Sequence, residues 1–207
     1  MKISPVSTCL AMILCFASSA HASAAFYARP SLYYTKVSVA NGVYTSGKLG
    51  LGVAAGCALG SKQSFALELE AVSTTGMKAH DVYGSSGSTT TEDTKVDMTQ
   101  CLFSFRYTVL PMDSAVRIFV GPTAGYWTEK GGSVRSTTFS YSSVVYPATT
   151  SSGTERGFLL GPTLGAAIKV NNQAKIELAY RQLWMLTSDG HNGHLTQQLC
   201  VGFNYRF

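Results

Sequence analysis

The stretch LTQQLCVGFNYRF, residues 195–207, decides the fold. From Leu199 onward every second residue is apolar or aromatic, and the residues between them are small or polar. Alternation with a period of two places the two sets on opposite faces of a β-strand. The pattern runs to the ring of Phe207, at a place where a soluble domain usually has a polar, frayed tail. We therefore expect the apolar face of this strand to contact lipid.

Seven further segments show the same alternation. Together with the C-terminal stretch, the eight segments cover residues 29–39, 48–59, 65–77, 95–109, 115–127, 156–169, 175–186 and 196–207. One face of each segment is apolar, and the other mixes glycine, small residues and charge. A glycine gains nothing on a solvent-facing strand, whereas the lumen of a narrow barrel needs small residues beside large ones. The prediction is an all-β fold, an eight-stranded antiparallel up-and-down transmembrane β-barrel. The alternative is a secreted sandwich in which the apolar face forms the core.

The connections between the segments support the barrel. Short turns at 60–64, 110–114 and 170–174 alternate with looser, polar connections at 78–94, 128–155 and 187–195. Outer-membrane barrels have short periplasmic turns and longer external loops. A Greek-key sandwich is not expected to sort its loops in this way.

The first 22 residues have the features of a secretory signal peptide. Lys2 supplies the positive charge, residues 6–17 form an apolar core too short to span a bilayer as a helix, and Ala20 and Ala22 fit the small-x-small cleavage rule. We expect a signal peptide at 1–22 and one barrel domain at 23–207.

Composition argues against several kinds of partner. The formal net charge of +5 is a mild excess, the basic residues form no run, and no nucleic-acid-binding motif accompanies them. After the signal peptide, Cys57, Cys101 and Cys200 lie within the alternating segments and lack the spacing of a metal site. We therefore expect no nucleic acid, no metal and no cofactor.

Charged residues recur on the face that the barrel would turn inward. The predicted lumen ion-pair network consists of Glu68, Glu70, Arg106, Arg117, Glu177 and Arg181. Side chains just fill an eight-stranded barrel, and an unpaired buried charge is costly, so acid and base should pair across the lumen. The pattern favours a plug over a gated path for small ions.

Three motifs carry a resemblance to a known family. The segments VGPT at 120–123 and LGPT at 160–163, together with the ending FNYRF at 203–207, resemble the small eight-stranded outer-membrane β-barrel family of OmpA transmembrane domains, OmpX and opacity-type surface proteins. The resemblance implies export through the periplasm to the outer membrane of a Gram-negative-type bacterium, in contact with lipid and lipopolysaccharide. It also implies that the outer-membrane assembly machinery reads Phe203, Tyr205 and Phe207 as a signal.

The functional alternatives differ in the part of the chain that would act. His191 and His194 share a loop with Ser188 and Asp189, as a lipid A-modifying enzyme would need, but catalytic side chains require a rigid support, so we expect no enzyme. The polar connections 78–94 and 128–155 suit contacts with a host or surface ligand. The prediction is a role in envelope integrity or in surface interaction and adhesion, with a narrow porin-like channel gated by the lumen ion pairs as the alternative.

Overall fold

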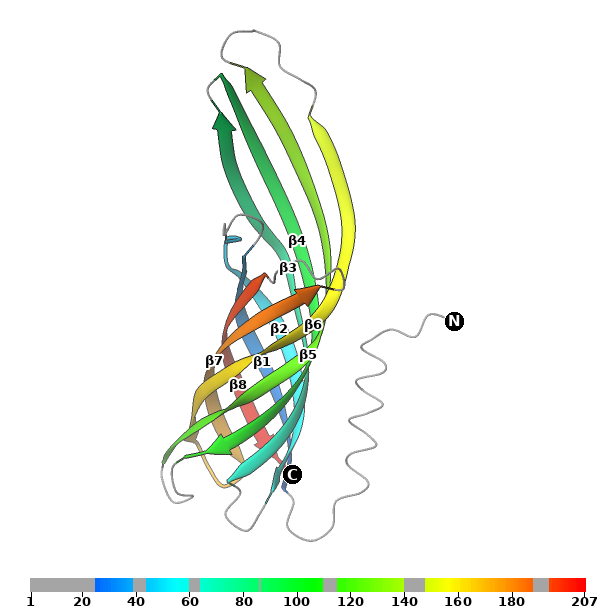
Figure 1. The fold of residues 1–207 in the computed structure, drawn as a ribbon. Coiled ribbons are helices and arrows are strands. Elements are labelled where there is room, and N and C mark those ends of the chain that lie inside the picture. The colour runs from blue at the N-terminus through cyan, green and yellow to red at the C-terminus, as the bar shows by residue number, and fades with distance from the viewer. Residues whose placement is uncertain are drawn as a thin grey trace.

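Eight strands form the fold (Figure 1). The computed structural model describes residues 25–38, 44–59, 64–85, 87–109, 115–139, 148–187 and 194–207. The strands are β1 (Ala25–Val37), β2 (Lys48–Leu59), β3 (Phe65–Ser85), β4 (Ser88–Thr108), β5 (Val116–Phe139), β6 (Thr149–Lys169), β7 (Ala174–Thr187) and β8 (Leu195–Arg206). The predicted signal peptide and its cleavage site at Ala20 and Ala22 lie outside the described residues.

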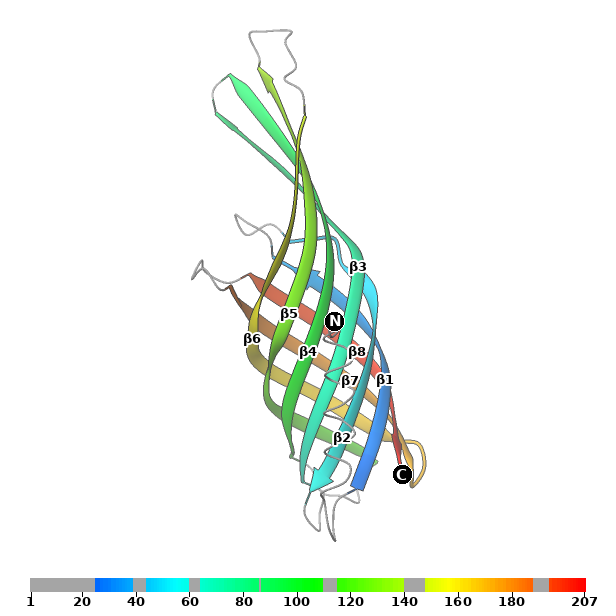
Figure 2. The same cartoon turned by 90° about the vertical axis from the view of Figure 1, so that its right-hand side faces the viewer.

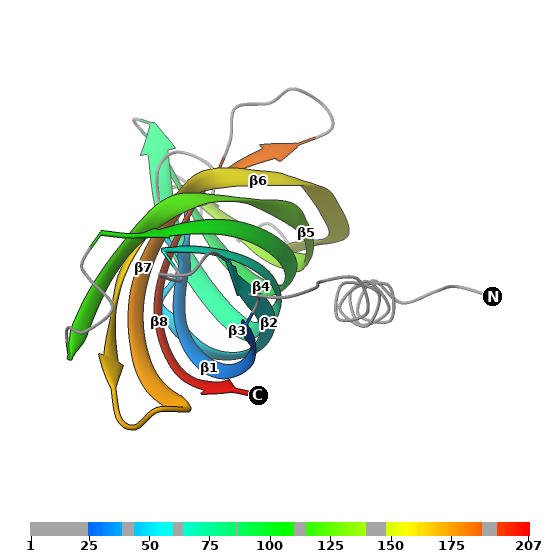
Figure 3. The ribbon, with the colours of Figure 1, turned by 90° about the horizontal axis from the view of Figure 1, so that it is seen from below.

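Each strand pairs antiparallel with the next, and β1 pairs with β8 to close the ring (Figure 3). Following paired residues once around the ring from Tyr27 leads to Val37, ten residues further along β1. A row of paired residues therefore climbs by little more than one residue per strand, because the strands are tilted against the barrel axis.

The two faces of the sheet have opposite character. Outward side chains are apolar or aromatic and exposed, with Leu49 at 70%, Leu51 at 69% and Phe158 at 67%, and we call this surface the apolar band. Inward side chains include fully buried Arg29 and Glu70. A sandwich would bury its apolar face, so the secreted-sandwich alternative is wrong. Among the described residues, no helix has the length and hydropathy required to cross a membrane.

Four strands are much longer than the others. Strands β3 to β6 have 21 to 24 residues, whereas β1, β2, β7 and β8 have 12 to 14. The long strands rise together above the ring as a four-stranded sheet (Figures 1 and 2). We call this sheet the extension; it comprises residues 78–85, 88–97, 128–139 and 149–156.

The expectation of loops at 78–94 and 128–155 is therefore wrong for most of their length. Both faces of the extension meet water, so its strands have no apolar alternation that a sequence pattern could reveal. Serine and threonine stabilise it through cross-strand hydrogen bonds, such as Thr91 with Ser136 at 2.6 Å and Ser133 with Ser151 at 2.9 Å.

A bulge interrupts β3 where the extension begins. The pairing register with β4 shifts between Thr74 and Met77. Gly76 lies in the bulge with a φ of 70°, which favours glycine, and its backbone N–H donates to Asp97 Oδ1 at 2.6 Å. Lys78 follows the bulge directly.

The turn between β6 and β7 is tight, as predicted. The Oδ1 atom of Asn171 accepts hydrogen bonds from the backbone N–H groups of Gln173 and Ala174, at 2.8 and 2.7 Å. Most of the turns at 60–64 and 110–114, and Ser188, Asp189 and His191, lie outside the described residues. On β8, Phe203 and Tyr205 point outward, and Phe207 follows the strand with 78% exposure. Their role as an assembly signal stays a prediction.

Candidate functional site

The middle of the lumen contains a compact ionic network of three arginines and three glutamates. Its members are at most 7% exposed, and they are Arg29, Glu68, Glu70, Arg106, Glu177 and Arg181. The formal charges of the network cancel. Alternating residues of β1, β3, β4 and β7 bring the six side chains inward to nearly the same level of the barrel.

Arg29 contacts all three glutamates. Its Nη2 lies 2.7 Å from Glu68 Oε1 and 3.1 Å from Glu70 Oε1, and its Nε lies 3.5 Å from Glu177 Oε2. Gly202 on β8 leaves the space for this side chain, because a Cβ there would lie 2.8 Å from Arg29 Cδ. The network therefore depends on a small residue on the neighbouring strand.

Arg106 and Arg181 complete the network. Arg106 lies 2.6 Å from Glu68 and 2.8 Å from Glu177, and Arg181 lies 2.6 Å from Glu70. The hydroxyl groups of Tyr27 and Tyr33 donate to Glu68 and Glu70 respectively. Each carboxylate thus accepts several charge-assisted hydrogen bonds, which offsets the desolvation of the buried charges.

The structure brings together five of the six residues predicted for the network. Arg117 is half-buried nearer the turn side, where it lines a cavity of about 60 Å³ with Lys175, Glu177 and Arg206. Arg29 takes its place in the network.

Packed side chains fill the lumen above the network. Gln198 Nε2 donates to Gln100 Oε1 at 2.7 Å. Over this polar pair lies an apolar layer of fully or almost fully buried side chains, which includes Met77, Met98, Trp127, Leu183 and Met185. The arrangement has the character of a plug.

The two faces of the extension differ in charge. The face continuous with the lumen carries Asp81, Glu92, Glu129 and Glu155 against Arg135. The face continuous with the apolar band carries Lys78, Lys95, Lys130 and Arg156, together with Asp97 and a His80–Asp93 pair at 2.7 Å. We call these surfaces the inner face and the outer face of the extension.

Two carboxylates on the inner face are perturbed in opposite directions. Glu129 lies directly opposite Glu155 just above the barrel, and burial together with the Glu155 charge raises the pKa of Glu129 to about 7. Glu92 accepts a hydrogen bond from Arg135 at 2.9 Å, which lowers the pKa of Glu92.

Among the residues that the structure describes, the extension has two open edges. The pairing of β2 with β3 ends near Thr74, apart from a bridge between Ser46 and Lys78, and the pairing of β6 with β7 ends at Gly157. The carbonyl of Lys78 accepts from the backbone N–H of Ser46 and so points toward β2. In an extended strand every second residue points the same way, so the backbone groups of His80 and Val82 face the open edge.

The histidines do not assemble a site within the described part of the chain. His80 is exposed in its pair with Asp93, and the carbonyl of His194 accepts from the backbone N–H of Met185 at 2.7 Å. No group of three or more His, Cys, Asp or Glu side chains among these residues is placed to hold a metal ion.

Comparison with known proteins gives a match to one family and to several solved structures. Residues 7–207 match the family model described as outer membrane protein beta-barrel domain. A search of curated protein sequences finds no match.

Three solved structures illustrate the similarity of fold. Neisserial surface protein A is 14% identical, with a TM-score of 0.56 over 90% of this chain and 100% of that one. Ail, the attachment invasion locus protein of Yersinia pestis, in complex with the heparin analogue sucrose octasulfate, is 9% identical, with a TM-score of 0.54 over 90% and 100%. The outer membrane protein OprG of Pseudomonas aeruginosa is 14% identical, with a TM-score of 0.50 over 90% and 97%. Identities this low show the fold alone.

Proposed function

Since the chain belongs to the outer membrane protein beta-barrel family and lies in the outer membrane, we propose that it is a surface-interaction protein whose extension binds a partner outside the cell. Two of the similar structures belong to a surface protein and to an attachment protein, which supports the proposal.

The observation that carries the proposal is the pair of open sheet edges. Within the described part of the chain, no strand pairs with residues 79–85 or 149–156 on their second side, so every second residue there has backbone groups without a neighbouring strand. An exposed edge of this kind is a template for an extended segment of another chain, because main-chain hydrogen bonds supply affinity. Natural proteins shield such edges with proline, lysine or a bulge, and residues 149–155 contain none of these.

The filled lumen supports surface interaction over conduction. The ionic network, the glutamine pair and the apolar layer occupy successive levels of the barrel, so a path for ions would require all three to rearrange. A narrow channel gated by the ion pairs is therefore the weaker candidate.

The first test removes the extension and keeps the barrel. Residues 80–93 and 131–152 are each replaced by a two-residue Asn-Gly turn. Bacteria that display this variant should lose most of their adhesion to an epithelial cell layer compared with bacteria that display the full chain. A mobility shift between boiled and unboiled samples of the outer-membrane fraction verifies that the variant folds. Unchanged adhesion by the folded variant would refute the proposal and leave envelope integrity, which detergent sensitivity of a deletion strain would measure.

A paired substitution distinguishes the edge from the side chains. Val82→Pro removes a backbone N–H that faces the open edge, whereas Val82→Ala changes only the side chain. We expect Val82→Pro to reduce adhesion toward the level of the truncated protein and Val82→Ala to retain it. Equal adhesion of the two variants would exclude edge pairing at β3.

A further inference from the structure

Four cations lie on the outer face of the extension, one on each strand. Lys78, Lys95, Lys130 and Arg156 are all exposed, and we call them the cationic stripe. Lys78 and Lys95 are direct cross-strand partners. None of the four forms an ion pair within the part of the chain that the structure describes.

The two acids on this face, Asp93 and Asp97, offset only half of the formal charge of the stripe. Asp93 pairs with His80, and Asp97, opposite Lys130, accepts the N–H of Gly76 at 2.6 Å. Like charges directly opposite each other destabilise a sheet. The Lys78–Lys95 pair is therefore unfavourable unless an anion lies against it.

The stripe runs level with the membrane. Lys95 pairs with Gly132, and Lys130 lies two residues below Gly132 on β5. Lys130 pairs with Thr154, and Arg156 lies two residues below Thr154 on β6. Relative to a row of paired residues, the stripe therefore descends by four residues from β4 to β6. A row of paired residues climbs ten residues in eight strands, which is about four residues over the three steps from β3 to β6. The two displacements cancel, so the four cations have nearly the same height.

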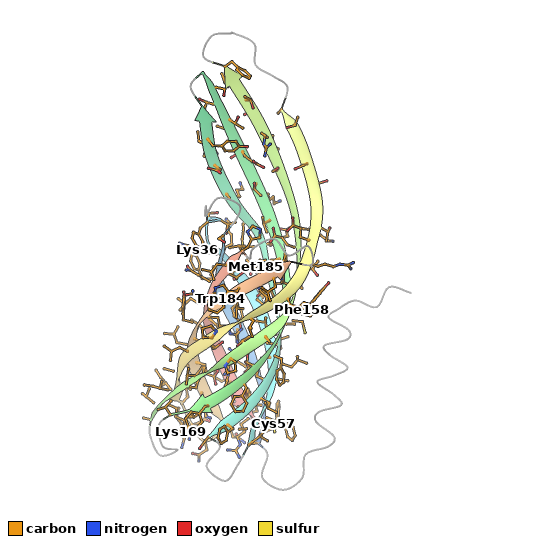
Figure 4. The ribbon with its side chains drawn as sticks, in the orientation of Figure 1. Lys36, Cys57, Phe158, Lys169, Trp184 and Met185 are labelled. Carbon is orange, nitrogen blue, oxygen red and sulfur yellow. The ribbon has the colours of Figure 1, made fainter. Side chains whose placement is uncertain are left out.

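That height is just above the apolar band. On the outward side of β6, Arg156 is the next residue after Phe158, about 7 Å further along the strand. Phe158 is 67% exposed and, like Trp184, lies at the upper end of the barrel (Figure 4). A residue immediately above the lipid-facing surface lies at the level of the lipid headgroups.

We propose that the cationic stripe binds phosphate groups of the outer-leaflet lipid. A phosphate between Lys78 and Lys95 removes their mutual repulsion and accepts hydrogen bonds from both ammonium groups. The even height of the stripe and its continuity with the apolar band fit a planar lipid surface better than a soluble polyanion. The truncated variant described above retains all four cations, so the two proposals fail independently.

The test compares two charge-matched double variants of the full chain. Lys78→Gln/Lys95→Gln removes the opposed pair, and Lys48→Gln/Lys169→Gln removes two exposed lysines outside the stripe. Each protein is folded in detergent, checked by its heat-dependent mobility shift and titrated with bisphosphorylated lipid A, and binding is measured by native mass spectrometry. The dissociation constant should rise about 10- to 30-fold for the first variant and stay within about twofold for the second.

Three results would overturn the proposal. The first is equal weakening in both double variants, which would indicate a general effect of net charge. The second is equal affinity of the wild-type protein for lipid A with and without its phosphates. The third is a stripe variant that loses retention on immobilised heparin but binds lipid A like the wild type, which would assign the stripe to a soluble polyanion.

Discussion

At the scale of single residues, the lumen depends on which side chains can reach one another. Arg29 contacts three carboxylates because Gly202 on the neighbouring strand β8 leaves space beside it, and each carboxylate also has a second arginine or a tyrosine as a partner. Removing one member of such a network leaves a buried charge without compensation, which is more costly than replacing the whole set by apolar groups.

Sequence reasoning found five network residues and missed the sixth. Arg29 begins the first predicted segment and precedes a proline, so it resembles a strand end. The signal was the inward set Tyr27, Arg29, Ser31 and Tyr33, which shares one parity on β1. Arg117 points inward, as the alternation predicts, but it lies too close to the turn side to reach the network. Alternation indicates the face on which a residue lies, and it does not indicate the residue's height along the barrel.

Glu129 gives a prediction for pH dependence. Its folded-state pKa, about 7, lies above its ordinary value near 4.5, so the folded protein binds a proton that the unfolded chain releases, and stability falls as pH rises from about 4.5 to about 7. The wild type should lose about 1 to 3 kcal/mol in free energy of unfolding between pH 5 and pH 8 relative to Glu129→Gln. Urea unfolding of detergent-folded protein measures the difference.

Glu92 provides the matched control, because its pKa is shifted in the opposite direction from that of Glu129. Glu92 has a lowered pKa in its pair with Arg135, so its contribution is present above the unfolded pKa and is lost on acidification. Glu92→Gln should therefore retain the wild-type loss of stability between pH 5 and pH 8. A Glu129→Gln variant with the wild-type pH profile would contradict the assigned pKa.

At the scale of elements, the apolar parts of the strands were predictable and the polar parts were not. Alternation marked the strands wherever one side faces lipid and the other a packed lumen. In the extension both sides are polar, so a segment such as STTTED at 88–93 has the composition of a loop although it pairs with strands on both sides. Backbone pairing forms it, and cross-strand hydrogen bonds between hydroxyl groups support it without leaving a periodic signal in the sequence.

Gly161 tests how closely β6 and β7 approach. A Cβ at this position would lie 1.9 Å from the carbonyl oxygen of Gln182, which backbone packing prevents from moving aside. Gly161→Ala should lower the free energy of unfolding by about 1 to 3 kcal/mol, measured by urea unfolding. Gly153→Ala on the same strand, where nothing lies within 4 Å, should stay within about 0.5 kcal/mol of the wild type. Equal loss of stability in the two variants would show that β6 and β7 do not approach each other this closely at Gly161.

At the scale of the whole molecule, the ring separates three environments. Lipid surrounds the apolar band, side chains fill the lumen, and the extension stands in water outside the membrane with an acidic inner face and a basic outer face. The eight-stranded ring followed from the sequence, because closure needs only the alternation and the loop pattern. The difference in length between the four long strands and the four short strands could not be predicted from the sequence.

Arg106→Ala tests whether the lumen conducts. Loss of this side chain leaves Glu68 and Glu177 with fewer partners and should lower the free energy of unfolding by about 3 to 5 kcal/mol. Conductance across a planar bilayer should stay at the wild-type level, because the apolar layer around Trp127 and Leu183 still fills the lumen. Lys169→Ala, an exposed change of equal charge, is the control. Increased conductance in Arg106→Ala alone would favour the gated channel.

The bulge in β3 changes which residues of the strand point inward. Below it the even-numbered residues of the strand, such as Val72 and Thr74, point inward; above it the odd-numbered residues Met77 and Ala79 do. Without the bulge the same sequence would continue with one uninterrupted alternation, and β3 would present its upper residues to the wrong sides. Lys78 would then turn toward the lumen and Asp81 toward the outer face of the extension. The one extra residue at the bulge thus lets two halves of β3 with opposite alternation share the same inward and outward faces of the barrel.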